Sequence, residues 1–68
     1  MAGQAMVGRT GSVTVRVPGG DRPGEIRLVM QGIPHHYIAY CPEPLAVGEK
    51  VLVVGDRGSR QVDVTPWQ

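Results

Sequence analysis

Turn-forming residues divide this chain into short segments, and their spacing restricts the fold to short strands. The 68 residues include ten Gly and six Pro, the residue types that most often interrupt helices and strands. Between the turns apolar and polar residues alternate, as at Val13, Val15 and Val17 with their polar neighbours. This period of two is typical of a strand with one buried face. Because no window shows the apolar stripe of a helix, we predict an all-β domain with little or no helix.

The alternation and the turns together predict five strands, at residues 7–17, 25–31, 35–41, 51–54 and 60–65. In the first strand Val13, Val15 and Val17 should share the buried face. By the same alternation, the inward residues of the second and last strands should be Ile26, Leu28, Met30, Val62 and Val64.

The connections between these strands are also predicted from the sequence. Residues 55–59 are rich in turn formers and should make a hairpin loop. In the connector at residues 45–50, either Leu45 or Val47 should enter the core. Trp67, close to the end of the sequence, should cover an open end of the fold.

Five short strands joined by tight turns favour a small closed barrel, because closure leaves no exposed sheet edge. A first strand that contains Gly8 and Gly11 can coil. We therefore predict a five-stranded OB-type β-barrel, and an SH3-like barrel is the alternative that periodicity does not exclude. Residues 7–67 should form this single domain after a flexible arm at residues 1–6. So small a chain buries little core, which argues against a deep active-site cleft.

Charge and cysteine content exclude several functional classes. Seven basic and six acidic residues give a net charge of +1, without the basic cluster common in nucleic-acid-binding modules. The single Cys excludes an internal disulfide and a multi-Cys zinc site, and it favours a reducing compartment. Nothing approaches the roughly 20 apolar residues that span a bilayer, and no signal peptide is visible. We therefore expect a soluble chain without a transmembrane segment, in a compartment such as the cytoplasm.

His35, His36 and Cys41 are the residues closest in type to a metal site or a reactive thiol. Successive strand residues point to opposite faces, so the two imidazoles do not converge on one ion, and zinc would need further ligands. Along a strand, five residues at about 3.3 Å each separate Cys41 from His36 by more than about 15 Å, too far for a base that activates a thiol. We therefore predict a structural thiol and no metal, cofactor, small-molecule substrate or catalytic site.

Three segments resemble, in order and spacing, the C-terminal soluble domain of NfeD-like proteins: VGRTGSVTV at 7–15, LAVGEKVLVVG at 45–55 and QVDVTPW at 61–67. They share a Val-Gly opening, a second Gly in the first strand, a Val-rich strand after Gly48 and a Val-x-Pro ending. The resemblance covers residues 7–67 and implies a five-stranded OB fold without the helix of many OB proteins. Residues 21–44 depart from it, since they are longer than the usual hairpin of the family.

The resemblance also implies a role. In NfeD-like proteins this domain is usually attached to transmembrane helices on the soluble side, and the proteins are thought to bind stomatin/prohibitin-like membrane proteins. Some long members carry a serine protease domain, for which these 68 residues leave no room. The expectation is thus a non-catalytic interaction or scaffolding domain, cytoplasmic or associated with a membrane from its soluble side. Its expected partner is a stomatin/prohibitin-like protein.

The candidate contact surface lies in the second and third predicted strands. Several apolar residues lie on alternation phases that a single barrel core does not use. They are Val29, Ile33, Ile38, Tyr40 and Leu52. An exposed apolar cluster commonly marks a partner surface, whereas bulges that shift the alternation would bury these side chains instead. The same apolar side chains permit weak self-association. The expected partner-binding residues are Arg27, Val29, Ile33, His35, His36 and Ile38.

A barrel that binds single-stranded nucleic acid is the second hypothesis, because OB folds often stack bases on aromatic rings beside a basic groove. The residues available for it are Arg16, Arg27, Tyr37 and Tyr40. Tyr37 and Tyr40 have opposite strand parity, so only one of them faces a given surface. The affinity of such a protein for nucleic acid falls steeply with salt, which distinguishes it from a protein with an apolar interface.

Overall fold

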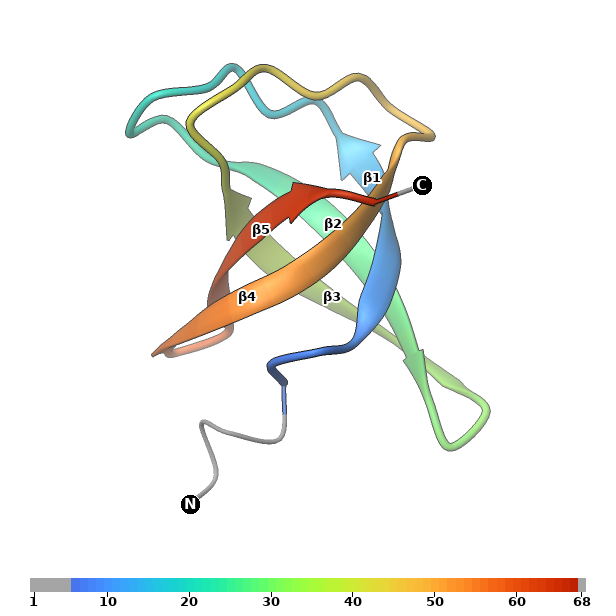
Figure 1. The fold of residues 1–68 in the computed structure, drawn as a ribbon. Helices are drawn as coiled ribbons and strands as arrows, with labels where there is room; N and C mark the ends of the chain where they lie inside the picture. The colour runs from blue at the N-terminus through green and yellow to red at the C-terminus, as the bar shows by residue number, and fades with distance from the viewer. Residues whose placement is uncertain (1–5, 68) are drawn as a thin grey trace.

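The computed structural model describes residues 6–67, which contain five strands. They are β1 (Thr10–Val15), β2 (Gly24–Met30), β3 (Ile33–Tyr40), β4 (Lys50–Gly58) and β5 (Gln61–Pro66). The strands close into a barrel in the order β1-β2-β3-β5-β4 (Figure 1), with β3 and β5 parallel and all other neighbours antiparallel. This order is that of an OB-type barrel and not of an SH3-like one. The predicted all-β, five-stranded OB-type barrel is confirmed, and the described residues include no helix.

One apolar core fills the barrel, and its members alternate along the strands as a period of two requires. The inward positions predicted for the second and last strands are confirmed, except that Met30 is only partly buried. Met30 is the last residue of β2, so the core stops before the turn that joins β2 to β3. The buried residues are Met6, Val13, Val17, Ile26, Leu28, Ala39, Cys41, Leu45, Val51, Val53, Val62 and Val64.

The first strand is shorter than predicted, and the burial expected for Val15 is wrong. Val13 and Val17 are buried, but the side chain of Val15 is 51% exposed. The register between β1 and β2 shifts between Val13 and Val15, and an extra residue at such a bulge moves the following side chain to the other face. Val17 regains the interior beyond the end of β1, where it pairs with Leu45 in an isolated bridge.

The fourth strand is longer than predicted, because residues expected in a hairpin loop continue it to Gly58. Two register shifts, after Val53 and after Asp56, let these residues stay paired with β5. The turn is reduced to Ser59 and Arg60, both with positive φ. Such a two-residue turn matches the twist of the strands that it joins.

The β3–β4 connection and the residues before β1 close the barrel. Leu45, not Val47, enters the core: Leu45 is 2% exposed and Val47 is 64% exposed. Backbone hydrogen bonds in both directions between Val17 and Leu45, at 3.0 and 2.9 Å, hold this segment in place. The flexible arm was expected to include residue 6, but Met6 is buried in the core. Residues 1–5 of that arm lie outside the described part of the chain.

Candidate functional site

The β2–β3 hairpin extends beyond the strands that flank it. Its two strands pair along their whole length, from Gly24 opposite Ala39 to Met30 opposite Ile33. In contrast, β5 pairs with β3 only from Ile38 onward, and the β1–β2 ladder ends at Arg27. The far half of the hairpin therefore projects from the barrel (Figure 1), and water reaches both of its faces.

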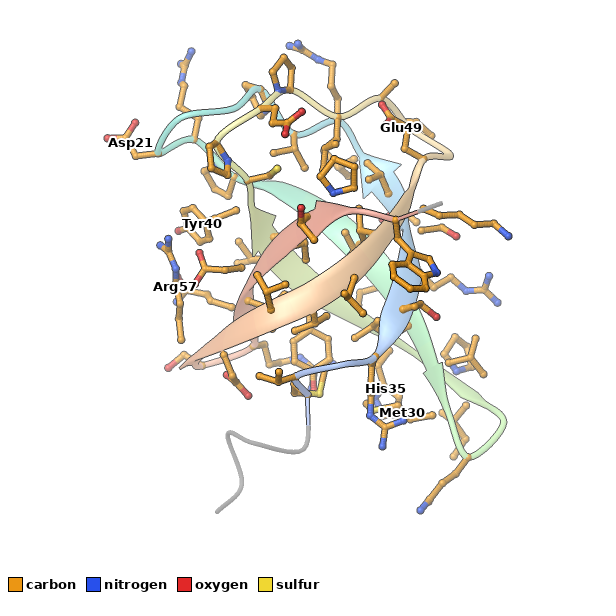
Figure 2. The ribbon with its side chains drawn as sticks, in the orientation of Figure 1. Asp21, Met30, His35, Tyr40, Glu49 and Arg57 are labelled. Atoms are coloured by element: carbon orange, nitrogen blue, oxygen red, sulfur yellow. The ribbon has the colours of Figure 1, made fainter. Side chains whose placement is uncertain are left out.

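The hairpin divides the predicted partner-binding residues between two faces. Arg27 and His36 are a cross-strand pair on the outer face of the barrel, and Val29 and Ile38 share this face with them. Ile33 and His35 instead have the parity of the inner face. Ile33 is exposed because it lies past the end of the core, and His35 is half-buried. His35 lies at the same end of the barrel as Met30 (Figure 2).

Three apolar side chains of the hairpin are exposed: Val29 and Ile38 because their alternation phase places them on the outer face, and Ile33 because it lies past the end of the core. The exposed fractions are 55% for Val29, 58% for Ile33 and 43% for Ile38. The β2–β3 ladder runs without a register shift, so no bulge turns these side chains inward. We call Val29, Ile33, Ile38 and the adjacent Arg27 and His36 the hairpin surface.

The residues of the nucleic-acid hypothesis are not brought together. Arg16 follows the last residue of β1, beyond the ladder end where Val15 pairs with Glu25, whereas Arg27 lies at the opposite end of that ladder. Tyr37 has the inner-face parity and is partly buried against the core. Tyr40 is on the outer face, so the two rings form no common platform.

Both tyrosine rings are already covered by an arginine. The guanidinium of Arg57 lies 3.8 Å from the ring centre of Tyr40 (Figure 2), and that of Arg60 lies 5.0 Å from Tyr37. Arg57 also donates two hydrogen bonds, of 3.0 and 2.7 Å, to Asp63 Oδ1. The hydrogen bond to Asp63 raises the pKa of Arg57 above its ordinary value. The contacts of Arg57 with Tyr40 and Asp63 tie β3, β4 and β5 together on their outer face.

Comparison with known proteins decides the family. The family model described as the NfeD C-terminal domain matches residues 10–65. The chain belongs to the NfeD C-terminal domain family. A similar solved structure is the solution structure of the soluble domain of the NfeD protein YuaF from Bacillus subtilis, with 33% sequence identity and a TM-score of 0.73. The alignment covers 87% of the present chain and 70% of the Bacillus chain.

A second solved structure matches this NfeD domain in fold. It is the C-terminal domain of stomatin operon partner protein 1510-C from Pyrococcus horikoshii, at 24% identity and a TM-score of 0.75. The alignment covers 97% of the present chain and 94% of the archaeal one. No curated protein sequence matches the chain.

Residues 6–67 of this NfeD domain contain neither a cluster of three or more His, Cys, Asp and Glu side chains that could hold a metal ion, nor a helix long and apolar enough to cross a membrane. His35 and His36 have opposite strand parity, as expected. Cys41 is 1% exposed and free, so its thiol lies in the core, where a structural thiol is expected.

Burial should control the reactivity of Cys41. In the folded NfeD domain its thiol is expected to react with a disulfide reagent at least about tenfold more slowly than in the unfolded chain, because a buried thiol reacts only when the structure opens. Absorbance of the released thiolate, followed with and without urea, measures both rates. Equal rates in the two conditions would show that Cys41 is accessible in the native domain.

A groove over β1 was not predicted from the sequence. It has a volume of about 350 Å³ and combines two hairpin residues, Arg27 and Val29, with residues of β1, β4 and the segment after β5. Trp67 lies in this groove and is 47% exposed, so it does not cover a barrel end as predicted. No pattern within one strand predicts the groove, because its shape depends on how β1 pairs with both β2 and β4. Its lining residues are Thr10, Gly11, Ser12, Arg27, Val29, Lys50 and Trp67.

Proposed function

We propose that this NfeD C-terminal domain is a non-catalytic interaction module that binds a stomatin-like, membrane-associated protein through the hairpin surface. The observation that carries the proposal is the exposure of Val29, Ile33 and Ile38 on a hairpin that projects from a closed barrel. We expect a partner to contact these side chains directly. Apolar side chains grouped on one projecting element are typical of such a contact.

The charge of the hairpin adds a constraint on the partner. The hairpin, residues 24–40, contains Arg27, His35 and His36 and one acidic residue, Glu25, which pairs with Ile38 at the end away from the turn. A partner surface with acidic groups around an apolar centre would complement this distribution, and complementary charge accelerates association and rejects wrong partners. The name of the archaeal relative, a stomatin operon partner protein, supports a stomatin-like protein as the partner.

The experiment compares Ile33→Asp with Val47→Asp by isothermal titration calorimetry against the soluble domain of a stomatin-like protein from the same organism. Both side chains are exposed, but Val47 lies in the β3–β4 connection, away from the hairpin. We expect Ile33→Asp to weaken binding at least about tenfold, because a carboxylate would be buried without a partner at an apolar contact. Val47→Asp should bind like the unchanged domain.

Equal affinities for the two variants would contradict the role of the hairpin surface, and no binding by the unchanged domain would contradict the partner. Salt is a second criterion. Binding that persists between about 50 and 200 mM salt fits an apolar interface, whereas binding of nucleic acid would fall by orders of magnitude over this range.

A further inference from the structure

Strand register places a row of five side chains across the outer face of the barrel. His36 of β3 pairs with Arg27 of β2, Arg27 pairs with Ser12 of β1, and Ser12 pairs with Lys50 of β4. The backbone N–H of Trp67 donates a hydrogen bond of 2.9 Å to the carbonyl of Lys50, which continues the row past β5. Side chains at paired positions lie on the same face of a sheet. The row is therefore continuous from an imidazole to an indole.

The centre of this row is the groove over β1. Ser12 is its smallest outward side chain, so the surface is lower there than at Arg27 and Lys50 on either side. Two strand spacings of about 4.8 Å separate the backbones of Arg27 and Lys50, or roughly 10 Å. The hydroxyls of Thr10 and Ser12 line the floor between the two cations and can donate to an anionic group there.

In the described part of the chain, the two cations of the groove lack a charged partner. Among residues 6–67 no ion pair or side-chain hydrogen bond involves Arg27 or Lys50; the salt bridge in this part of the chain joins Arg57 to Asp63. No carboxylate of residues 6–67 lines the groove. Arg57 illustrates the contrast, since its charge is already satisfied. The groove thus presents two positively charged side chains from strands whose backbones lie roughly 10 Å apart, with an exposed indole beyond one of them.

We propose that this row binds an acidic, extended peptide segment whose two carboxylates pair with Arg27 and Lys50 and whose next residue, an apolar one such as proline, packs on Trp67. In the polyproline II conformation, an extended helix of three residues per turn, residues i and i+3 lie on the same side about 9 Å apart, close to the roughly 10 Å between the backbones of Arg27 and Lys50. Proline-containing segments dock on exposed aromatic rings in other recognition modules. Single-stranded nucleic acid fits less well, because it needs several stacking rings and the row has one.

This inference does not depend on the hairpin surface being the stomatin-binding site. Lys50 and Trp67 lie outside that surface, so variants of these two residues test the groove separately. The chain contains a single Trp, and the fluorescence of Trp67 therefore reports directly on the groove.

The experiment titrates the domain with the peptide acetyl-Glu-Ser-Ser-Glu-Pro-Pro-amide, followed by Trp67 fluorescence and by ¹H–¹⁵N NMR. The same peptide with Gln in place of Glu is the ligand control. We expect saturable changes at Thr10, Ser12 and Trp67 with the acidic peptide only. Lys50→Gln should weaken its binding at least about fivefold, as loss of one charge-assisted pair predicts. Arg22→Gln, which removes an exposed charge from the β1–β2 connection, should leave binding unchanged.

Three results would overturn the proposal. The acidic peptide could cause no saturable change, it could bind Lys50→Gln as well as the unchanged domain, or its shifts could map to another surface. The titration is repeated with oligothymidylate of six nucleotides. Saturation of the groove by the oligonucleotide, without binding of the peptide, would assign the row to nucleic acid instead.

Discussion

Replacing Gly24 with Ala is expected to lower the free energy of unfolding by about 3 kcal/mol or more, the upper range for an atom forced into a packed site. A Cβ at residue 24 would lie 2.5 Å from the carbonyl oxygen of Arg16 and against that of Val15. Both obstacles are backbone atoms, so no rotation of a side chain relieves the clash. A domain of this size has a total stability of only about 3–10 kcal/mol, so this loss is a large fraction of it.

Gly55→Ala is the matched control for Gly24→Ala. A Cβ at residue 55 would meet only the side chain of Asp63, at 3.2 Å from Oδ2, and a side chain can move by a few tenths of an ångström. Its cost should stay below about 1 kcal/mol. Urea denaturation followed by circular dichroism gives both free energies. Equal losses for the two variants would show that the approach of β1 to β2 at Gly24 is not a rigid constraint.

The fold was predictable because local sequence signals agree with one another. Alternation correctly placed Ile26, Leu28, Val62 and Val64 in the core. The turn residues correctly divided the chain into five strands. Closure of five short strands then follows from the need to cover sheet edges. The predictions failed at Val15 and at residues 55–59. Both failures are bulges, which depend on how a neighbouring strand fits and so have no local signature beyond a permissive glycine.

The hairpin surface could be predicted from the sequence, whereas the groove could not. The exposure of Val29 and Ile38 followed from their alternation phase, which the β2–β3 ladder keeps without a register shift, whereas Ile33 is exposed because the core ends before the turn. The groove requires Arg27, Ser12 and Lys50 to be in line. These residues come from three strands, and β1 and β4 are far apart in the sequence. Only the closed barrel brings them together, so alternation within one strand cannot reveal them.

The two proposed surfaces share one edge of the molecule. Arg27 belongs to the hairpin surface and also lines the groove. Because the hairpin is one continuous pair of strands, a partner held by its apolar side chains would place its flanking residues near the groove. An acidic segment next to the apolar contact of the partner could then use Lys50 and Trp67. Because both segments would belong to one partner, binding at the first surface would make binding at the second intramolecular. The overall affinity would then exceed the affinity of either contact alone.

Leu45 is the second residue whose replacement should have a large effect, because it enters the core from the connection between β3 and β4. It is 2% exposed at the end of the core, and its backbone pairs with Val17 through hydrogen bonds of 2.9 and 3.0 Å. Leu45→Ala would leave a cavity there. The expected loss is about 2–4 kcal/mol, as for other buried Leu residues.

Val47→Ala is the control for Leu45→Ala, since Val47 lies two residues further along the same connection and is 64% exposed. Its loss should be within about 0.5 kcal/mol. Thermal unfolding of both variants, followed by circular dichroism, measures the difference. Leu45→Ala should also speed the reaction of the Cys41 thiol with a disulfide reagent, because Cys41 is buried in the same core and would be exposed more often. A Leu45→Ala domain as stable as Val47→Ala would mean that the barrel end is closed by other residues, and that the β3–β4 connection only spans it.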